Sequence, residues 1–252
     1  MAAALPFGDY VGVVQRAGTG LLACANEAGL AAKVPTCPTW TMAHLVGHQA
    51  MVHRWAAAHL RGDDPDAVPG QTELRRRPDL LEYFATGLTE VVAALRAAPP
   101  DLQAMTFLYD VTDARTFWAR RQAHETTVHA VDALAAVLGR VPTEAEAGVP
   151  PQVGDDGVDE LLRGFFTRGR SRLYDGTPCT LHVRATDTRR SWWVRVDEQL
   201  TVADDGADPD VVVQGSAAAL YLALWNRGDD IEVSGDHSLV ARWRTTQRIR
   251  WS

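Results

Sequence analysis

Two residues in the segment 120–132 have the types and the spacing of metal ligands. Glu125 and His129 are four residues apart in a stretch whose pattern predicts a helix. Because a helix turns once every ~3.6 residues, both side chains leave the same face, one turn apart. A carboxylate and an imidazole stacked in this way supply half of a metal site. On their own, they would equally suit an ordinary contact on a helix surface.

A third candidate ligand, His48, belongs to a separate predicted helix over 41–60. It shares an apolar stripe with Leu45, Val52 and Trp55, and this spacing is typical of a face turned toward neighbouring helices. Taken alone, His48 would more simply be a core histidine. Two helices that each direct ligand-type residues into a bundle can hold a metal between them. Three protein ligands would leave coordination positions open, as in a catalytic site.

Three residues next to the Glu125 and His129 pair have more than one interpretation. Asp132, one turn beyond His129, suits either the orientation of a ligand imidazole or a plain surface charge. His124 points about 100° away from Glu125, so we expect it to support the site or to pack beside it. Arg121, one turn before Glu125, is a candidate to bind an anionic substrate.

Composition limits the classes of protein to which the chain can belong. It has 252 residues, of which 46% are hydrophobic and 23% charged, so it is globular and near the size at which one core divides into two. The net charge of −7 argues against a general nucleic-acid binder, and no apolar run approaches membrane-spanning length. The first residues lack the basic stretch of a secretory signal, and three widely spaced cysteines without a CxxC pair fit a reduced compartment. We therefore expect a cytoplasmic protein.

The first part of the chain predicts a four-helix bundle. Helical periodicity and breakers indicate helices over 9–32, 41–60, 78–98 and 113–138, and the segment 62–70 is rich enough in Pro, Gly and Asp to be a loop. We place this domain at residues 1–145.

The second part predicts a small α+β domain over residues 146–252. The acidic, Pro- and Gly-rich stretch 143–157 suits a linker or a long loop, and a helix over 158–174 follows it. The period then shifts toward two, which indicates strands that we expect to form an antiparallel sheet. These strands are 180–186, 192–196, 211–214 and 231–233, with helices over 217–226 and 239–247.

The motifs together resemble the mycothiol-dependent maleylpyruvate isomerase family of DinB-like metalloenzymes. The resemblance rests on Trp-Thr-Met-Ala-His-Leu-Val-Gly-His over 40–48, on the His-Glu-x-x-x-His-x-x-Asp pattern of 124–132, and on Leu-Trp-Asn-Arg over 224–227. The Val-Ser-Gly-Asp segment 233–236 and Trp243 add to it, so nearly the whole chain is covered in order. One departure is His44, where family members often have an acidic residue.

The resemblance implies a site, cofactors and partners. His48, Glu125 and His129 would bind one divalent metal, usually zinc, in the bundle. A C-terminal domain similar to sterol carrier proteins would contribute a catalytic arginine, which by motif is Arg227. The implied thiol cofactor is mycothiol, and the other partner is a small electrophile. We expect the protein to bind neither nucleic acid nor a membrane. We expect a monomer or a homodimer.

These residues suggest a reaction without a redox step. A metal-stabilised thiolate adds to an electron-poor cis double bond, the resulting single bond rotates, and expulsion of the thiolate leaves the trans isomer. If the thiolate stays attached, the same site performs S-transfer. A dicarboxylate substrate needs cationic groups, for which Arg227 is the first candidate and Arg121 and the run 75–77 are weaker ones. Arg227 would equally suit a helix cap, and 75–77 a solvated charge cluster.

Two other functions fit the same sequence. The chain could be a non-catalytic protein that binds an apolar ligand in its C-terminal domain and keeps a structural metal in its bundle. It could also be a family member that acts on an unrelated acceptor.

Overall fold

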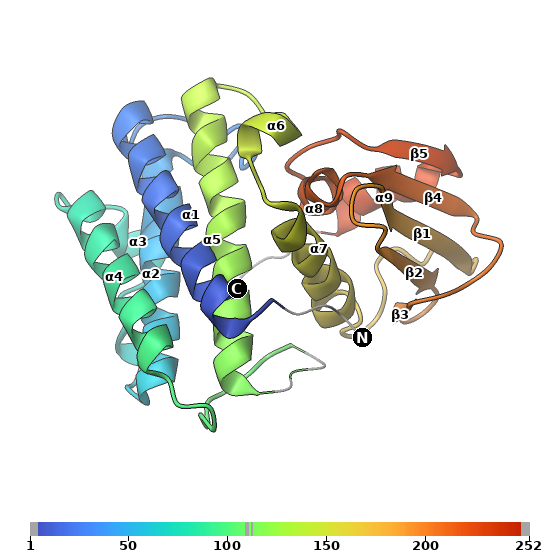
Figure 1. Cartoon of the computed structure of the whole chain (residues 1–252). Helices are drawn as coiled ribbons and strands as arrows, with labels where there is room; N and C mark the ends of the chain where they lie inside the picture. Colours follow the sequence, from blue (N-terminus) through green and yellow to red (C-terminus); the bar gives the residue numbers. More distant parts are fainter. Residues whose placement is uncertain (1–4, 109–110, 112, 248–252) are drawn as a thin grey trace. The chain divides into compact units, whose positions relative to one another are not determined.

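The chain folds into two compact units, which we describe from a computed structural model of residues 5–108, 111 and 113–247 (Figure 1). The first, the helical unit, comprises Pro6–Phe107 and Val111–Pro142. The second, the sheet unit, comprises Thr143–Ser252 together with Met1–Leu5 and Leu108–Asp110. The sequence-based boundary between residues 145 and 146 stays a prediction.

The helical unit is a four-helix bundle, as the sequence predicts. Its long helices are α1 (Phe7–Ala28), α2 (Met42–Arg61), α4 (Leu80–Ala97) and α5 (Ala114–Leu138), which run side by side in Figure 1. The connection between α2 and α4 also contains two short helices, η1 (Pro65–Ala67) and α3 (Gln71–Leu74), that the sequence did not predict. One turn of helix is too short to show a periodic pattern.

Local sequence signals fix the ends of the helix that carries two candidate ligands. The Asp113 carboxylate accepts a hydrogen bond from the Thr116 backbone N–H at 2.7 Å and so caps the start of α5. Gly139 closes the helix in the left-handed conformation, with φ of 68°. The packed core that positions α2 and α5 is apolar and includes Leu21, Met42, Leu45, Leu74, Leu80 and Phe84.

The sheet unit contains a five-stranded mixed sheet. The strands are β1 (Cys179–Ala185), β2 (Ser191–Val196), β3 (Thr201–Ala203), β4 (Val211–Gly215) and β5 (Glu232–Gly235), in the order β3-β2-β1-β4-β5. The prediction of an antiparallel sheet is wrong for one pair, because β1 and β4 are parallel. Alternation of apolar residues reveals a strand and its buried face but carries no information about the direction of its partner. The short β3 was also missed.

Helices begin where the sequence analysis expected a linker. The segment 143–157 contains α6 (Glu144–Ala147) and most of α7 (Pro151–Asp159), and it is followed by the π-helical turn η2 (Glu160–Phe165). The linker prediction is therefore wrong. Thr143 and Glu146 form a capping box, and Pro151 occupies the first turn of α7. Residues that end helices in one place start them in another. Helical structure then ends at Phe165, short of the predicted residue 174, while α8 (Ala217–Leu224) and α9 (His237–Thr246) agree with prediction to within a few residues.

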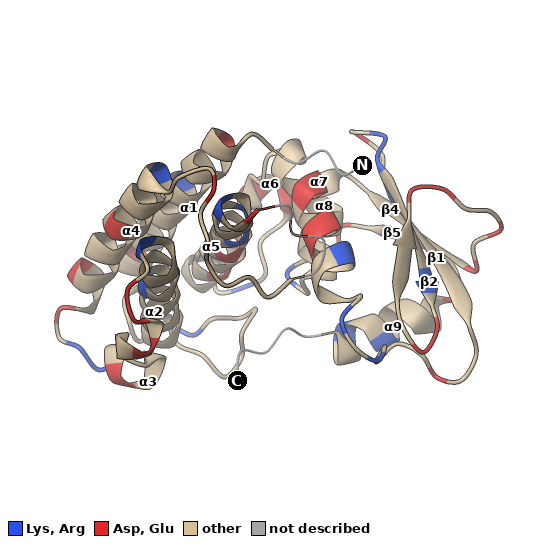
Figure 2. Cartoon of the chain, turned by 90° about the horizontal axis from the view of Figure 1, so that it is seen from below, with Lys and Arg blue, Asp and Glu red and all other residues tan. Residues whose placement is uncertain are grey.

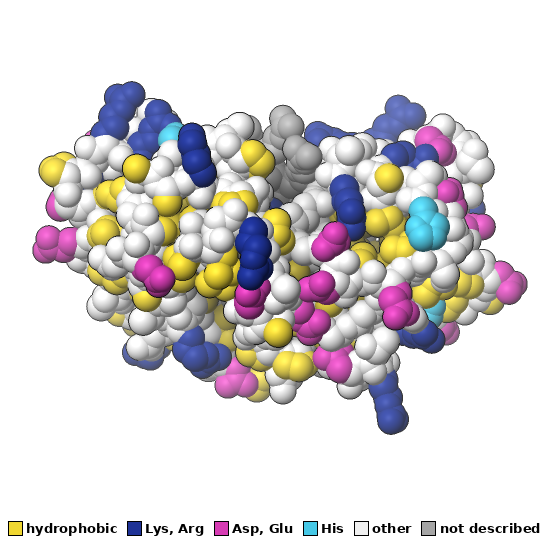
Figure 3. Space-filling view, turned by 90° about the horizontal axis from the view of Figure 1, so that it is seen from above, with side chains coloured by type: hydrophobic (Ala, Val, Ile, Leu, Met, Phe, Trp, Pro, Cys, Tyr) yellow, Lys and Arg dark blue, Asp and Glu magenta, His cyan; other side chains and the backbone are white. Residues whose placement is uncertain are grey.

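The described surface is mixed in character. Figure 2 shows basic and acidic residues on both units, so neither sign of charge is confined to one of them. On the face shown in Figure 3, apolar side chains lie scattered among polar ones. Among the described residues, Met105 and Val141 are the exposed large hydrophobic side chains. None of the helices described here combines the length and the apolarity needed to span a membrane.

A close helix contact in the sheet unit gives a test of this packing. A Cβ atom added to Gly154 on α7 would lie 2.6 Å from the backbone carbonyl carbon of Ala217, at the start of α8. Because backbone cannot move aside as a side chain can, we expect Gly154→Ala to lower the free energy of unfolding by about 1–3 kcal/mol. Denaturant titration would measure the change. Gly20→Ala, in an open position on α1, is the control and should be neutral or slightly stabilising; equal effects would contradict the packing argument.

Candidate metal centre

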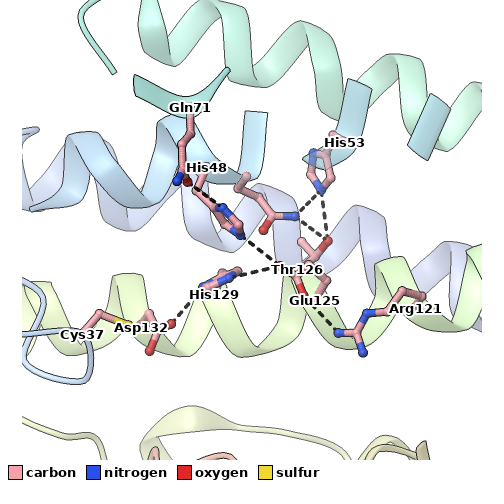
Figure 4. A network of polar contacts seen from close by, with 10 residues as sticks. Cys37, His48, His53, Gln71, Arg121, Glu125, Thr126, His129 and Asp132 are labelled. Carbon is pink, nitrogen blue, oxygen red and sulfur yellow. Dashed lines mark hydrogen bonds and ion pairs between the residues drawn. The ribbon is translucent and has the colours of Figure 1, made fainter. Parts of the chain in front are cut away.

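Three buried side chains from two helices converge inside the helical unit. His48 comes from α2, and Glu125 and His129 come from α5. One potential ligand atom from each lies within 4.8 Å of the others, and Figure 4 shows them pointing toward one another. Their exposed fractions are only 2%, 3% and 7%. The structure thus brings together the three residues that the sequence nominated as ligands.

Glu125 lies at the centre of the cluster. Its Oε1 atom is 3.1 Å from His48 Nε2 and 3.2 Å from His129 Nε2. Its other oxygen, Oε2, accepts a hydrogen bond from Arg121 Nη2 at 3.1 Å. The Arg121 side chain is itself 1% exposed, so it acts directly on the charge of Glu125. The substrate-binding role suggested for Arg121 stays a prediction.

The outer ring nitrogens decide which way the histidine lone pairs point. His48 Nδ1 lies 3.0 Å from Gln71 Oε1, and His129 Nδ1 lies 2.9 Å from Asp132 Oδ2. Both partners are oxygen acceptors, so each Nδ1 carries a proton and donates it. In a neutral ring, the Nε2 atom then turns a lone pair toward Glu125 Oε1.

Lone pairs that face a carboxylate oxygen need a cation between them, either a proton or a metal ion. Two imidazoles and a carboxylate form a ligand set that suits zinc and other divalent metals. Their outer atoms are already held by oxygen acceptors, as is usual for ligand histidines. The residues present therefore fit a divalent metal.

Burial and charge act against each other in this cluster. Burial alone would raise the pKa of Glu125, but the close contacts of its carboxylate with the His129 and His48 rings, with the charges of His129 and Arg121, hold that pKa well below its usual range. Burial alone would lower the pKa of His129, but hydrogen bonds to Asp132 and Glu125 raise it to about 9. Without a metal, a proton on His129 balances the charge of the carboxylates.

Asp132 and His124 both lie inside the protein. Asp132 is fully buried, which excludes the surface-charge interpretation, and its Oδ2 atom also accepts a hydrogen bond from Cys37 Sγ at 3.6 Å. Asp132 thus fixes the orientation of the His129 ring. His124 is fully buried on the same helix, α5. Its supporting role stays a prediction.

Sequence reasoning missed several residues around the ligands. Gln71, on the short helix α3, holds His48, and the Trp40 ring lies 5.2 Å from the His48 ring and stacks on His129 at 5.9 Å. Gln71 follows an irregular loop, so no periodic signal marks it. Trp40 belongs to the motif that carries the family resemblance, and its position there is the one signal that singles it out.

A neutral polar layer lies beside the ligands. His53 Nε2 is 2.8 Å from Gln49 Nε2 and 3.0 Å from Thr126 Oγ1. The His53 side chain is fully buried, and this burial lowers its pKa to about 3. His53 therefore stays uncharged and adds no positive charge beside the candidate metal ligands.

Arg227 lies in the sheet unit, immediately after α8. Its side chain is half-buried, and its Nη1 atom donates a hydrogen bond to the Trp225 carbonyl oxygen at 2.7 Å. This contact with the end of α8 is the kind expected of the helix-capping alternative. The catalytic role of Arg227 stays a prediction.

Comparison with known proteins assigns the family. Residues 13–134 match the mycothiol maleylpyruvate isomerase N-terminal domain, and residues 152–242 match the C-terminal domain of the same family. The chain belongs to the mycothiol-dependent maleylpyruvate isomerase family. The resemblance stated from the motifs is thus confirmed, as is the fold class of a helical bundle with an α+β domain.

Solved structures agree with this fold. A crystal structure of the mycothiol-dependent maleylpyruvate isomerase matches with a TM-score of 0.63 and 18% identity, over 91% of this chain and 93% of that one. A point mutant of that enzyme matches over the same shares, with a TM-score of 0.60 and 18% identity. The ubiquinone synthesis protein UbiJ-SCP2 covers 38% of this chain with 23% identity but a TM-score of only 0.28, so the likeness to sterol carrier proteins stays a prediction. No curated protein sequence matches the chain.

The charge balance predicts how the stability of the metal-free protein depends on pH. The pKa of His129 is about 9 in the folded state, against an ordinary value of 6.5. Its contribution to stability is therefore complete below about pH 6.5 and is lost as the pH rises through about 9. We expect a loss on the order of 3 kcal/mol at most, measured by urea unfolding of chelator-treated protein. His129→Gln should abolish this dependence; the same slope in both proteins would contradict the assignment.

The Asp132 contact predicts a specific loss of metal affinity. Asp132→Asn keeps the shape of the side chain but removes the charge that holds the His129 ring, so zinc should bind about 10–100-fold more weakly. Competition with a chromophoric chelator would measure this affinity. Asp9→Asn, an exposed position on α1, makes the same change in net charge and should leave the affinity unaltered. Unchanged affinity in a folded Asp132→Asn protein would refute the orienting role.

Proposed function

We propose that the chain is a metal- and thiol-dependent enzyme that isomerises a maleylpyruvate-like cis double bond, with mycothiol as the thiol. The metal, which we take to be zinc, would be held by His48, Glu125 and His129. One observation carries the proposal: three buried ligand-type side chains converge within 4.8 Å of one another. Membership of the mycothiol-dependent maleylpyruvate isomerase family supports the same conclusion.

When bound, a divalent metal at this site would supply the positive charge that stabilises a thiolate at neutral pH. The protein's part is to prepare the site. His48 and His129 hold their Nε2 lone pairs inward because Gln71 and Asp132 hold their outer nitrogens. Asp132 is fully buried, so water is excluded from its contact with His129, and the low local polarity strengthens that contact.

Two groups restrict the freedom of the site further. Arg121 occupies the second oxygen of Glu125, which leaves Oε1 directed at the histidines. The Trp40 ring stacks on the His129 ring with an interplanar angle of 22°. An aromatic wall there gives an unsaturated substrate an apolar surface beside the ligands.

The same thiolate could also remain bonded to an electrophile, which would make the reaction an S-transfer. The acceptor decides between the two outcomes, because only a conjugated cis double bond can be regenerated by expulsion of the thiolate. Isomerisation is our first choice, since both domains of the chain match domains that are named after a maleylpyruvate isomerase. The partners are then a small electrophile and a low-molecular-weight thiol.

A second candidate function is supported by an apolar pocket in the sheet unit. The pocket could bind an apolar ligand, with the bundle metal serving structure alone. Its lining is almost entirely hydrophobic and comprises Leu181, Val213, Ala223, Leu224, Ile231, Leu239, Val240, Trp243 and Arg244. A protein of this kind would bind a fatty ligand equally well with and without metal.

The decisive experiment measures zinc content beside activity. Wild-type protein should contain near one zinc per chain and isomerise maleylpyruvate with mycothiol, because all three ligands are in place. His48→Ala and His129→Ala should each lose both the zinc and the activity. His237→Ala, at an exposed position on α9, is the matched control and should keep both. If a folded wild-type protein takes up no zinc, the proposal that the chain is a zinc-dependent enzyme is wrong.

Glu125→Ala separates a catalytic metal from a structural one. In an enzyme whose metal serves catalysis, the variant should lose activity to background while its far-ultraviolet circular dichroism stays close to that of the wild type. Its thermal unfolding should shift to a lower temperature, because the buried Arg121 loses its partner. A structural metal would make the fold depend on Glu125, and activity and the folded structure would then be lost together.

A further inference from the structure

A pocket in the helical unit adjoins the metal centre. It opens between the start of α2, the short helix α3 and the chain that follows α3. Its lining combines an aromatic ring with polar and basic groups, namely Trp40, His44, Gln71, Thr72 and Arg75. Three of these five residues, Gln71, Thr72 and Arg75, lie on α3 or at its end.

Two residues line the pocket and also contact the candidate metal ligands. Gln71 lines the pocket and also holds His48 Nδ1 through its Oε1 atom at 3.0 Å. Trp40 lines the pocket and packs its ring on those of His48 and His129. A molecule in the pocket therefore lies only one side chain away from the proposed metal ligands.

Arg75 brings a positive charge to this pocket without an acidic partner. Its guanidinium contacts His44 Nε2, and in the described part of the chain no carboxylate pairs with it. Two nearby arginines differ in this respect: Arg77 pairs with Asp79 at 2.7 Å, and Arg61 pairs with Asp63 at 2.6 Å. Arg75 is also half-buried. A half-buried guanidinium that lacks a counter-ion is suited to bind an anion.

His44 orients Arg75 without neutralising it. The His44 Nδ1 atom accepts a hydrogen bond from the Thr41 backbone N–H at 3.2 Å and lies 2.9 Å from Thr41 Oγ1, which holds the ring at the start of α2 with its Nε2 atom against the Arg75 guanidinium. Burial lowers the pKa of His44, and the charges of Arg75 and Lys33 lower it further. The imidazole therefore stays uncharged.

The backbone fixes the place of Arg75. A Cβ atom on Gly47 of α2 would lie 3.0 Å from the Arg75 backbone nitrogen and 3.1 Å from its Cα atom. Because glycine has no side chain, the segment after α3 can pass directly over α2 at this point. The guanidinium is thereby held beside His44, one turn before His48.

We propose that Arg75 binds a carboxylate group of the electrophilic substrate in this pocket, beside the metal centre. A guanidinium matches a carboxylate through two parallel hydrogen bonds. The Gln71 amide and the Thr72 hydroxyl line the same pocket and can donate further hydrogen bonds. The inference rests on the proposed function for the identity of the substrate. The anion site itself rests on Arg75 and its surroundings.

Binding of maleate, a small cis-unsaturated dicarboxylate, tests this proposal on the full chain. Calorimetric titration should show saturable binding to the wild type, with and without zinc. Arg75→Gln should weaken that binding by about tenfold or more, because a charge-assisted contact is lost. Arg76→Gln, an exposed neighbour with the same change in net charge, should alter it by less than about twofold. Zinc content and thermal unfolding should stay unchanged in both variants.

Two results would contradict the assignment of Arg75 as the carboxylate-binding residue. The wild type could show no saturable binding of maleate, or the wild type and Arg75→Gln could bind maleate with equal affinity. A parallel titration with N-acetylcysteine, a small thiol that carries a carboxylate, tests whether Arg75 prefers a carboxylate on a thiol to one on the acceptor. If Arg75→Gln weakens only the binding of N-acetylcysteine, the acceptor assignment is wrong. If the protein does not bind zinc, the proposed function is wrong. The maleate affinities of the wild type and Arg75→Gln can still be compared in the metal-free protein, so the two failures are distinguishable.

Discussion

Glu125 holds a negative charge in a part of the bundle that water hardly reaches, and the surrounding structure serves to balance it. One oxygen faces the Nε2 atoms of His48 and His129, and the other accepts a hydrogen bond from Arg121. An isolated carboxylate in such a place would be protonated, since burial disfavours the charged form. The opposite direction of its pKa shows that the neighbouring groups outweigh burial. This balance needs α2 and α5 together, because His48 comes from α2 and Glu125 and His129 come from α5.

Support for the ligands comes from outside the two helices as well as from within them. Gln71 reaches His48 from α3, whereas Asp132 reaches His129 from the next turn of α5. The two ring orientations thus depend on different parts of the chain. Substitutions in the connection between α2 and α4 would reach the site through His48, and those along α5 would reach it through His129. A packed apolar core, including Leu45 and Phe84, holds the helices that carry both.

The long helices and the ligand set could be predicted because they follow periodic rules. Glu125 and His129 are one helical turn apart, and His48 lies on an apolar stripe, so geometry alone suggested where each points. Residues outside that periodicity could not be predicted in the same way. Gln71 stands on a single helical turn after an irregular loop, and the parallel pairing of β1 with β4 depends on the path of the chain. The two helices α6 and α7 were missed because Pro and acidic residues start helices as well as end them.

Gln71 belongs both to the support of His48 and to the wall of the neighbouring pocket. Two sites that share a side chain are thermodynamically linked whenever a ligand at one of them shifts the position of that side chain. Such coupling is reciprocal: the factor by which one occupant changes the affinity for the other is the same in both directions. The Gln71 amide can rotate about its own side chain while α3 stays in place. This single amide would therefore be enough to make the binding of an acid and the retention of a cation interdependent, without any movement of the helices.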